Sequence, residues 1–377
     1  MLGLGLSLGL APIQGVGAWA ATRAALKAQT MAYGGIPSTS GSPTFTLGTA
    51  NAGPTISGTT VDRTDIAFRY SGAEVYVPTG FPDNLGYKSY NVTPDGSGGT
   101  KAYVAATFEF GYTGQAMEVY VKGNGARMRL SIDGVYQSAN FAQLPNTGSF
   151  YYYKVDFGSA TPRQIKIEHA SNLLFLGIRR ETAATISAPT APTRLRLIVA
   201  GDSFTEGTGT LAYDGFAQIA GKLLGFSDIW ASGSGGTGWI QTNGSRVALG
   251  DRFVQDVSSR TPDVAILAMG LNDEGDGNDA SVVTAMRTAI AAQRATKPAT
   301  MIYVVGPWDP SAPSAPPGGR TSLRDAMQAG CAGLGGVKFF DPVGVSYTKY
   351  DTTHPDTAGH VTLGTWLADR IKADLGL

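Results

Sequence analysis

Short runs of β-branched and aromatic residues, separated by turn signals, dominate the stretch 61–186. In the run RMRLSI at 127–132, apolar and polar side chains alternate, which is the period of a strand that buries one face. Asp133 and Gly134 follow, and both residue types favour tight turns. The pattern predicts an antiparallel, jelly-roll-like β-sandwich over 61–186, with two half-buried sheets.

The period changes after the segment SAPTAPT at 187–193, whose prolines and small residues predict a domain boundary. Beyond it, apolar strand-like runs alternate with helical patterns near 213–224, 281–296, 321–332 and 357–374. Apolar strands between helices are typical of a parallel sheet covered on both faces, whose ligands bind outside the carboxyl ends of the strands. We therefore expect an α/β domain over 195–377.

Residues 1–60 show neither pattern, and we interpret them as a Gly- and Ala-rich N-terminal arm followed by a linker. The apolar start resembles a signal peptide, but no Lys or Arg precedes it, and glycines and Pro12 interrupt it. The same interruptions argue against a membrane span, which needs about 20 continuous apolar residues. The arm could pack against another copy of the chain and form a homo-oligomer. The compartment stays open, with a slight preference for an extracellular or virion-associated location.

The charge balance and the cysteine content argue against nucleic-acid binding, a disulfide framework and a cysteine-rich zinc site. The 377 residues carry 29 basic and 29 acidic side chains, and only 15% of the chain is charged, so the basic footprint of a nucleic-acid-binding protein is missing. The single cysteine, Cys331, excludes an intrachain disulfide and a cysteine-rich zinc site. We expect neither a metal nor a cofactor, and no nucleic-acid partner.

Ser203 follows the first apolar strand of the α/β region, in the stretch LIVAGDSFTEG. Gly, Asp and Ser are all turn formers, and a lone serine is a weak nucleophile at neutral pH. The end of a buried parallel strand is nevertheless where such a sheet places its site. Ser203 is therefore a candidate nucleophile, provided that a base lies beside it.

Only three histidines can serve as that base. His169 falls in the predicted sandwich and His360 inside the predicted last helix, whereas His354 precedes Pro355 and so lies outside regular helix. Asp351 stands three residues before His354, a spacing that lets the carboxylate accept the Nδ1 proton while Nε2 faces outward. The alternative is that the segment DTTHPD only caps the last helix.

Two further strand ends carry candidate donors for an oxyanion. Asn272 in MGLND is either an ordinary turn former or a neutral amide donor. The loop WASGSGGTGW contains Gly233, Gly235 and Gly238, which fit G-x-G-x-x-G, so a nucleotide-binding enzyme is a rival hypothesis. Because the loop follows the second strand and precedes a poor helix start, we favour a loop that brings backbone N–H groups to a reacting atom.

Gly-Asp-Ser, the glycine loop, Gly-x-Asn-Asp and Asp-x-x-His occur in this order over 195–377 and resemble the motifs of the SGNH hydrolases, also called GDSL esterases. The resemblance implies a three-layer α/β/α fold and hydrolysis of acyl or acetyl esters. It makes Ser203 the nucleophile, His354 the base and Asp351 the orienting acid.

The same resemblance assigns an oxyanion hole to the Ser203 N–H, the Asn272 side chain and a glycine N–H. Matching GGT to the family's Gly-x-Thr selects Gly235, and a slip of one residue would select Gly236. Two departures from the family pattern are Phe204 in place of the usual Leu and the missing Asn at the end of the second strand.

The sandwich resembles the jelly-roll accessory domain that precedes this catalytic domain in some carbohydrate esterases. We therefore predict a serine esterase that hydrolyses short acyl esters, acetyl in the first place, of a small molecule or polysaccharide through an acyl-enzyme on Ser203. The rival is a virion or cell-surface structural or glycan-binding protein with a weak or silent esterase domain. Trp239, Trp308 and the loop 307–320 are candidate substrate contacts, although each tryptophan is as readily explained by packing.

Overall fold

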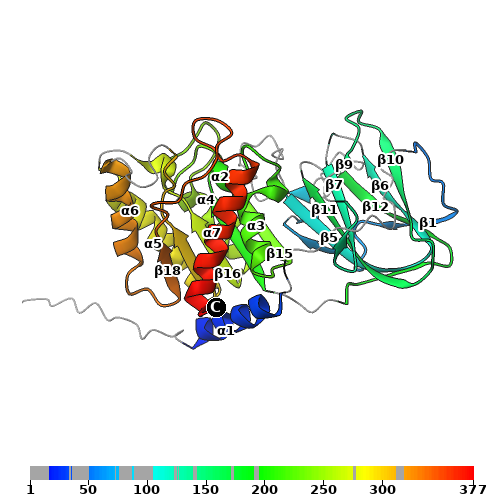
Figure 1. Cartoon of the computed structure of the whole chain (residues 1–377), viewed down its shortest axis with the longest axis horizontal. Helices are drawn as coiled ribbons and strands as arrows, with labels where there is room; N and C mark the ends of the chain where they lie inside the picture. Colours follow the sequence, from blue (N-terminus) through cyan, green and yellow to red (C-terminus); the bar gives the residue numbers. More distant parts are fainter. Residues whose placement is uncertain are drawn as a thin grey trace, which may run out of the picture.

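Two bodies make up the described part of the chain, an antiparallel β-structure and an α/β structure beside it (Figure 1). The computed structural model describes residues 17–33, 35, 51–72, 74–75, 87–88, 105–122, 125, 127–138, 142–170, 174–190, 195–274, 277–310 and 318–377. The predicted fold class, a sandwich followed by a parallel α/β domain, is confirmed.

The antiparallel body is a sandwich of two sheets. One sheet has the order β1-β12-β6-β10, with β1 Gly58–Asp62, β12 Leu174–Glu181, β6 Ala116–Lys122 and β10 Phe150–Asp156. The other has the order β13-β5-β11-β7-β8, with β13 Thr185–Ser187, β5 Ala105–Thr113, β11 Pro162–Ala170, β7 Arg127–Ile132 and β8 Val135–Tyr136. Smaller strands are β2 Arg69–Ser71 and β9 Ala142–Gln143 on the second sheet, and the separate pair β3 Glu74–Val75 and β4 Tyr87–Lys88. Aromatic and aliphatic side chains from both sheets form one core between them.

The turn between β7 and β8 forms where the sequence predicts it. Asp133 and Gly134 have φ values of 50° and 80°, the left-handed pair that a two-residue hairpin requires. Along β7 the apolar positions face the core as expected, but Arg129 and Ser131 on the other face are buried as well. They are buried because β5 and β11 of this sheet pack against the α/β body through the short helix η1, Ala212–Asp214.

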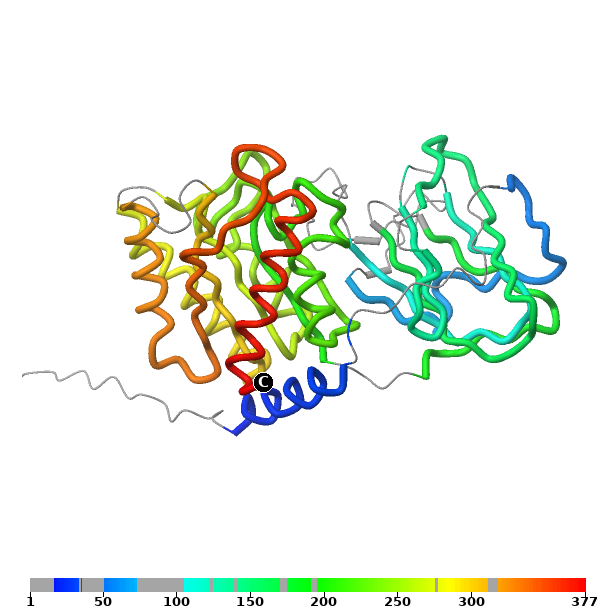
Figure 2. The backbone as a smooth tube through the Cα atoms, in the orientation of Figure 1, coloured from blue at the N-terminus to red at the C-terminus, as the bar shows by residue number. Residues whose placement is uncertain are grey.

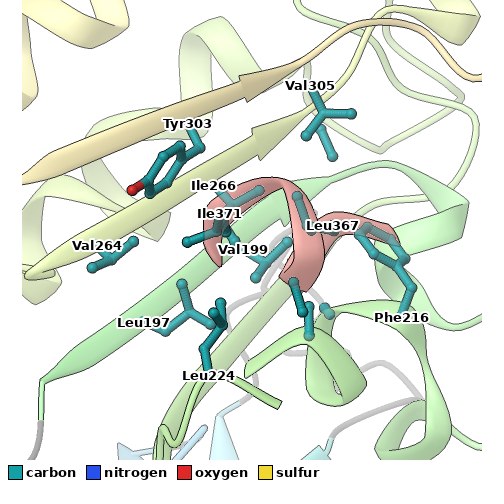
Figure 3. Close-up of a cluster of buried hydrophobic side chains, with 14 of the residues drawn as sticks. Leu197, Val199, Phe216, Leu224, Val264, Ile266, Tyr303, Val305, Leu367 and Ile371 are labelled. Carbon is teal, nitrogen blue, oxygen red and sulfur yellow. The ribbon is translucent and has the colours of Figure 1, made fainter. Parts of the chain in front are cut away.

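The α/β body contains a five-stranded parallel sheet in the order β15-β14-β16-β17-β18. The strands are β14 Arg196–Gly201, β15 Asp228–Gly233, β16 Val264–Ala268, β17 Met301–Val305 and β18 Val337–Phe340. Helices α3, Phe216–Leu223, and α7, Thr357–Leu375, cover one face through a core that includes Leu197, Val199 and Leu367 (Figure 3). Helices α4, Leu249–Asp256, α5, Asp279–Thr296, and α6, Gly318–Cys331, cover the other.

Part of the N-terminal arm belongs to the α/β body, contrary to our interpretation of 1–60 as an arm and linker. Helix α1, Ala18–Ala32, lies beside the C-terminal end of α7 (Figure 2) and buries Leu26 completely in the core on that face. Thr30 donates a hydrogen bond to the Leu224 carbonyl. The sequence did not predict this helix because its many small residues show little hydrophobic periodicity. Its apolar face packs within the same chain.

The sandwich begins earlier than the predicted boundary at residue 61. Strand β1 starts at Gly58, and the Thr55 backbone and hydroxyl both donate to the buried carboxylate of Glu118. Residues 1–16, with the signal-like start, lie outside the described residues. None of the helices in the described ranges combines the length and hydropathy that a membrane crossing needs.

Candidate active site

Ser203 begins a short helix directly after strand β14, which lies between β15 and β16 in the sheet. Asp202 caps that helix, α2, Ser203–Glu206, by accepting the Phe204 N–H, and Gly207 ends it with φ 85°. Gly201 permits the tight strand-to-helix turn, because a Cβ there would collide with the Thr205 hydroxyl and the Ala268 carbonyl. The serine is thereby fixed at the carboxyl edge of the sheet.

His354 and Asp351 meet Ser203 at this edge. The His354 Nε2 lies 2.9 Å from the Ser203 Oγ, and its Nδ1 lies 2.7 Å from the Asp351 Oδ2. The other carboxylate oxygen, Oδ1, accepts the backbone N–H groups of Thr353 and His354, both at 2.7 Å. The structure thus brings the three residues into one hydrogen-bonded chain although 151 positions separate the serine from the histidine.

The Asp351 carboxylate stays anionic and so orients the ring. Hydrogen bonds from the His354 side chain, the His354 backbone and the Thr353 backbone lower the pKa of Asp351 to about 2. An anionic acceptor at Nδ1 favours the tautomer that carries its proton there. Nε2 then presents a lone pair to the Ser203 hydroxyl, which is the arrangement a general base needs.

The segment DTTHPD also caps the last helix, and it does so through Asp356. Asp356 is the N-cap of α7, and its side chain accepts the Gly359 N–H at 2.8 Å. Asp351 and His354 lie before the cap, on a loop where Lys349 and Pro355 form an isolated bridge. Capping and orientation of the histidine are therefore carried by separate carboxylates.

The remaining histidines lie away from the serine. His360 in α7 is fully buried; its Nδ1 accepts the Phe216 N–H and its Nε2 lies 3.0 Å from the Thr208 carbonyl. Burial lowers the pKa of His360 to about 4, so it stays neutral and ties α3 to α7. His169 is buried in the sandwich beside Phe108.

The two predicted oxyanion donors line the same pocket as Ser203. The Asn272 amide nitrogen donates to the Thr237 carbonyl at 2.9 Å and lies 3.4 Å from the Asp202 Oδ2. The Gly235 N–H donates to the Glu206 Oε2 at 2.7 Å. Both donors therefore have internal acceptors in the protein without substrate.

Sequence reasoning gave no role to the acidic residues that hold these loops. The buried Asp202 accepts from the Phe204 N–H and lies beside Asn272; burial raises the pKa of Asp202 to about 7. Asp273 accepts three consecutive backbone N–H groups, those of residues 239–241. Asp202 belongs to the Gly-Asp-Ser motif and Asp273 to the Gly-x-Asn-Asp motif. The two motifs could therefore have pointed to these acids as well as to Ser203 and Asn272.

The pocket has a volume of about 720 Å³, and most of the residues that line it are polar. Besides the residues above, its lining includes Thr208, Gly209, Thr210, Asn243, Arg246, Leu271, Tyr350 and Thr353. Trp239 and Trp308 are buried in the two cores of the α/β body, so packing accounts for both. Residues 311–317 of the predicted contact loop lie outside the described residues. Among the described residues, no group of three or more His, Cys, Asp or Glu could hold a metal ion.

The glycine loop does not have the arrangement of a dinucleotide site. After β15 the next helix, α4, begins only at Leu249, so no helix N-terminus follows the glycines. Instead, Gly238 packs against the Asp273 carboxylate so closely that a Cβ would collide with it. These glycines serve close backbone packing around the pocket.

A parallel sheet covered on both faces, with a serine, a histidine and an aspartate hydrogen-bonded in series at its carboxyl edge, is the arrangement of the α/β serine hydrolases. Residues 199–361 match the model of the GDSL-like lipase/acylhydrolase family. This part of the chain is similar to that family, and the protein is a carboxylic ester hydrolase.

Several solved structures share the fold over most of the chain. A family two carbohydrate esterase from Cellvibrio japonicus is 15% identical with a TM-score of 0.65, covering 85% of this chain and 98% of its own. An acetyl xylan esterase from Butyrivibrio proteoclasticus is 14% identical, with a TM-score of 0.59 and coverage of 85% and 99%. A salicylyl-acyltransferase from a tetracycline biosynthetic pathway is 18% identical, with a TM-score of 0.64 and coverage of 87% and 99%. No curated protein matches in sequence.

Proposed function

We propose that the protein removes acetyl groups from carbohydrate esters through an acyl-enzyme on Ser203. The observation that carries the proposal is the hydrogen-bonded series Asp351, His354, Ser203 at the mouth of a polar pocket. The names of the esterase structures with the same two-part fold support the substrate class.

In the first half of the reaction, the Ser203 Oγ attacks the ester carbonyl carbon while the His354 Nε2 takes the hydroxyl proton. The carbonyl oxygen becomes an oxyanion that accepts from the Ser203 N–H, the Gly235 N–H and the Asn272 amide. The C–O bond to the alcohol then breaks, and His354 returns its proton to the leaving oxygen. The acyl group remains on Ser203, and Asp351 balances the charge of the imidazolium while it exists.

In the second half, a water molecule attacks the acyl carbon while the His354 Nε2 takes one of its protons. Collapse of the second oxyanion breaks the bond to the Ser203 Oγ, which recovers the proton from His354. The carboxylic acid leaves and the resting state is restored.

The pocket wall supports a polyhydroxylated alcohol and a short acyl group. Thr208, Thr210, Asn243 and Thr353 line the pocket beside the serine, and their hydroxyl and amide groups are of the kinds that bind the hydroxyls of a sugar. Leu271 and Tyr350 are the only large apolar side chains among the residues that line this pocket, so we expect a short acyl group to fit it better than a long one.

The test is hydrolysis of chromogenic esters from acetyl to octanoyl, and of acetylated xylo- and cello-oligosaccharides, by wild type and Ser203→Ala. We expect a preference for acetyl and a loss of at least about 10⁴-fold in kcat/KM in the variant. Equal rates would exclude Ser203 as the nucleophile. A folded wild type without activity on any ester would favour the rival, a surface or virion protein with a silent domain. Transfer to an added alcohol in preference to water would assign acyl transfer instead.

A further inference from the structure

The carboxylate of Glu206 takes up the hydrogen-bond donor that the proposed reaction needs. Glu206 stands three residues after Ser203 in α2, so both side chains leave the same face of the helix. Its Oε2 accepts the Gly235 N–H at 2.7 Å, and the side chain is buried. An ester carbonyl oxygen would need the same N–H.

Arg246 binds both partners of this contact. Its Nη1 lies 3.2 Å from the Glu206 Oε2 and donates to the Gly235 carbonyl at 2.7 Å. Reciprocal backbone hydrogen bonds with Asn243 hold Arg246 on the pocket wall, where its side chain is 32% exposed. The guanidinium therefore has room to turn with the carboxylate.

The ion pair also lies next to the nucleophile. A methyl group placed on the Gly235 Cα would contact the Arg246 Nη1, and it would lie 2.7 Å from the Glu206 Oε2 and 3.3 Å from the Ser203 Cβ. Both charges are thus close enough to act on negative charge that develops on a carbonyl oxygen bound at Ser203.

We propose that Glu206 and Arg246 are positioning residues that control access to the Gly235 N–H. Without substrate, the Glu206 carboxylate occupies this donor. When an ester binds, its carbonyl oxygen replaces the carboxylate, which turns toward Arg246, and the arginine compensates a negative charge that would otherwise repel the oxyanion. This inference rests on the proposed function of Gly235 as an oxyanion donor.

The two members of the pair should have opposite effects on the rate. Glu206→Gln keeps the size of the side chain but replaces a charged acceptor by a weaker neutral one, so the oxygen of the substrate competes more easily for Gly235. Arg246→Ala leaves the Glu206 charge uncompensated beside the oxyanion. A purely structural ion pair would lower activity and stability when either member is removed.

The experiment is a double-mutant cycle on acetyl ester hydrolysis with Glu206→Gln, Arg246→Ala and the double variant. We expect Glu206→Gln to raise kcat/KM about three- to tenfold and Arg246→Ala to lower it about tenfold, mainly through kcat, with the double variant within about threefold of wild type. Asp369→Asn, which removes an exposed carboxylate paired with Lys372 on α7, is the control and should change nothing. A loss in both single variants would overturn the inference, as would no change in either, which would point to Gly236 as the donor.

A second measurement does not need turnover and so separates failure of the inference from failure of the proposed function. In the Ser203→Ala background, acetate is titrated while the ¹⁵N–¹H resonance of Gly235 is followed. Adding Glu206→Gln should shift this resonance in the absence of acetate and lower the acetate concentration for half-saturation about three- to tenfold. An unchanged resonance and an unchanged acetate curve would contradict the inference, whatever the esterase assay shows.

Discussion

Two carboxylates of this protein are ionised in the folded state but differ in their surroundings. Asp351 lies in the candidate active site, and Glu168 lies where the two bodies meet. The pKa of each is about 2. The Asp351 side chain is 42% exposed, whereas Glu168 is completely enclosed. The first keeps its charge through local hydrogen bonds at the surface, and the second keeps it in the interior only because several cations and a phenol surround it.

The partners of Glu168 come from both bodies. Within the sandwich, Arg129 donates to its Oε2 at 2.6 Å and 3.1 Å, and Tyr136 donates to its Oε1 at 2.6 Å. Burial alone would raise the pKa of Glu168, but Lys222 of α3, Lys166 and Arg129 outweigh it. The cluster therefore joins the sandwich to the α/β body.

Accessibility, more than charge, separates the proposed catalytic acid Asp351 from the structural acid Glu168. Asp351 binds an imidazole whose other nitrogen lies beside Ser203, so in the proposed reaction its charge acts on the proton that the serine gives up. Glu168 bonds only to fixed partners, so its charge contributes to domain docking. Substitution of the first should change rate, and substitution of the second should change stability.

The largest expected effect is on the rate of Asp351→Asn. The neutral amide no longer fixes the Nδ1 proton, so the Nε2 of His354 loses its orientation and its charge compensation. We expect kcat to fall about 10³- to 10⁴-fold, while the urea midpoint stays within error because this side chain is well exposed. Steady-state kinetics and urea unfolding measure the two. A large decrease in the urea midpoint of Asp351→Asn would mean that Asp351, like Glu168, contributes to the stability of the fold.

Glu168→Ala should give the reverse pattern. It leaves the buried Arg129 and the half-buried Lys222 without their carboxylate. Removal of one member of such a cluster costs about 3 to 5 kcal/mol of unfolding free energy. The kcat per folded molecule should stay within about twofold of wild type. Chemical denaturation and active-site titration check this. A variant that is fully folded but has lost activity would show that the contact between the two bodies affects the geometry of the active site.

Acid should weaken the Glu168 cluster in a defined pH range. Because the folded pKa, about 2, lies below the ordinary value of 4.5, the folded state binds fewer protons than the unfolded state, and the contribution is present above pH 4.5. It decreases as the pH falls from about 4.5 to 2, by about 3 kcal/mol. Burial lowers the pKa of Lys222 to about 8, so this lysine is positively charged throughout. Unfolding free energies at several pH values should show the slope, and Glu168→Gln should flatten it.

The smallest effect is expected for Tyr136→Phe. The variant removes one hydrogen bond to Glu168 and keeps the ring under the Arg129 guanidinium, 4.2 Å from the ring centroid. A hydrogen bond to a charged group contributes about 1.5 to 3 kcal/mol, so the unfolding free energy should fall by that amount at most. A Tyr112→Phe variant, which loses a bond to a backbone carbonyl inside the sandwich, is the matched control. An equal decrease in unfolding free energy in Tyr136→Phe and Tyr112→Phe would mean that the bond to the charged Glu168 is no stronger than a bond to a backbone carbonyl.

The sequence predicted the α/β body, and it predicted that Ser203, His354 and Asp351 would meet at one sheet edge, because both depend on local signals. Buried parallel strands are continuous apolar runs in the sequence. Asn272, Asp351 and His354 lie in turns beyond such strands, and the carboxyl ends of parallel strands meet at one edge of the sheet. The Asp351–His354 spacing is short enough that the chain itself sets it. Contacts between distant polar residues have no such signal, so the bond between Glu206 and Gly235 was not predicted.

Burial at the domain interface was equally hidden. Alternation along β7 shows which side chains face the sandwich core, but it does not show that another body covers the opposite face. Arg129 and Glu168 therefore look like solvent-exposed residues in the sequence, and only docking on η1 and α3 encloses them.

Helix α1 precedes the sandwich in the chain, yet it packs on the α/β body that follows the sandwich. The α/β body is therefore discontinuous, and the sandwich is an insertion within it. During synthesis the sandwich can close as soon as β13 emerges. Helix α1 must wait for α7, which follows the sandwich in the chain, before Leu26 is buried and Arg23 reaches Asp374. A chain that begins at residue 195 would leave that apolar site open to water, so the smallest complete catalytic unit is longer than its motifs suggest.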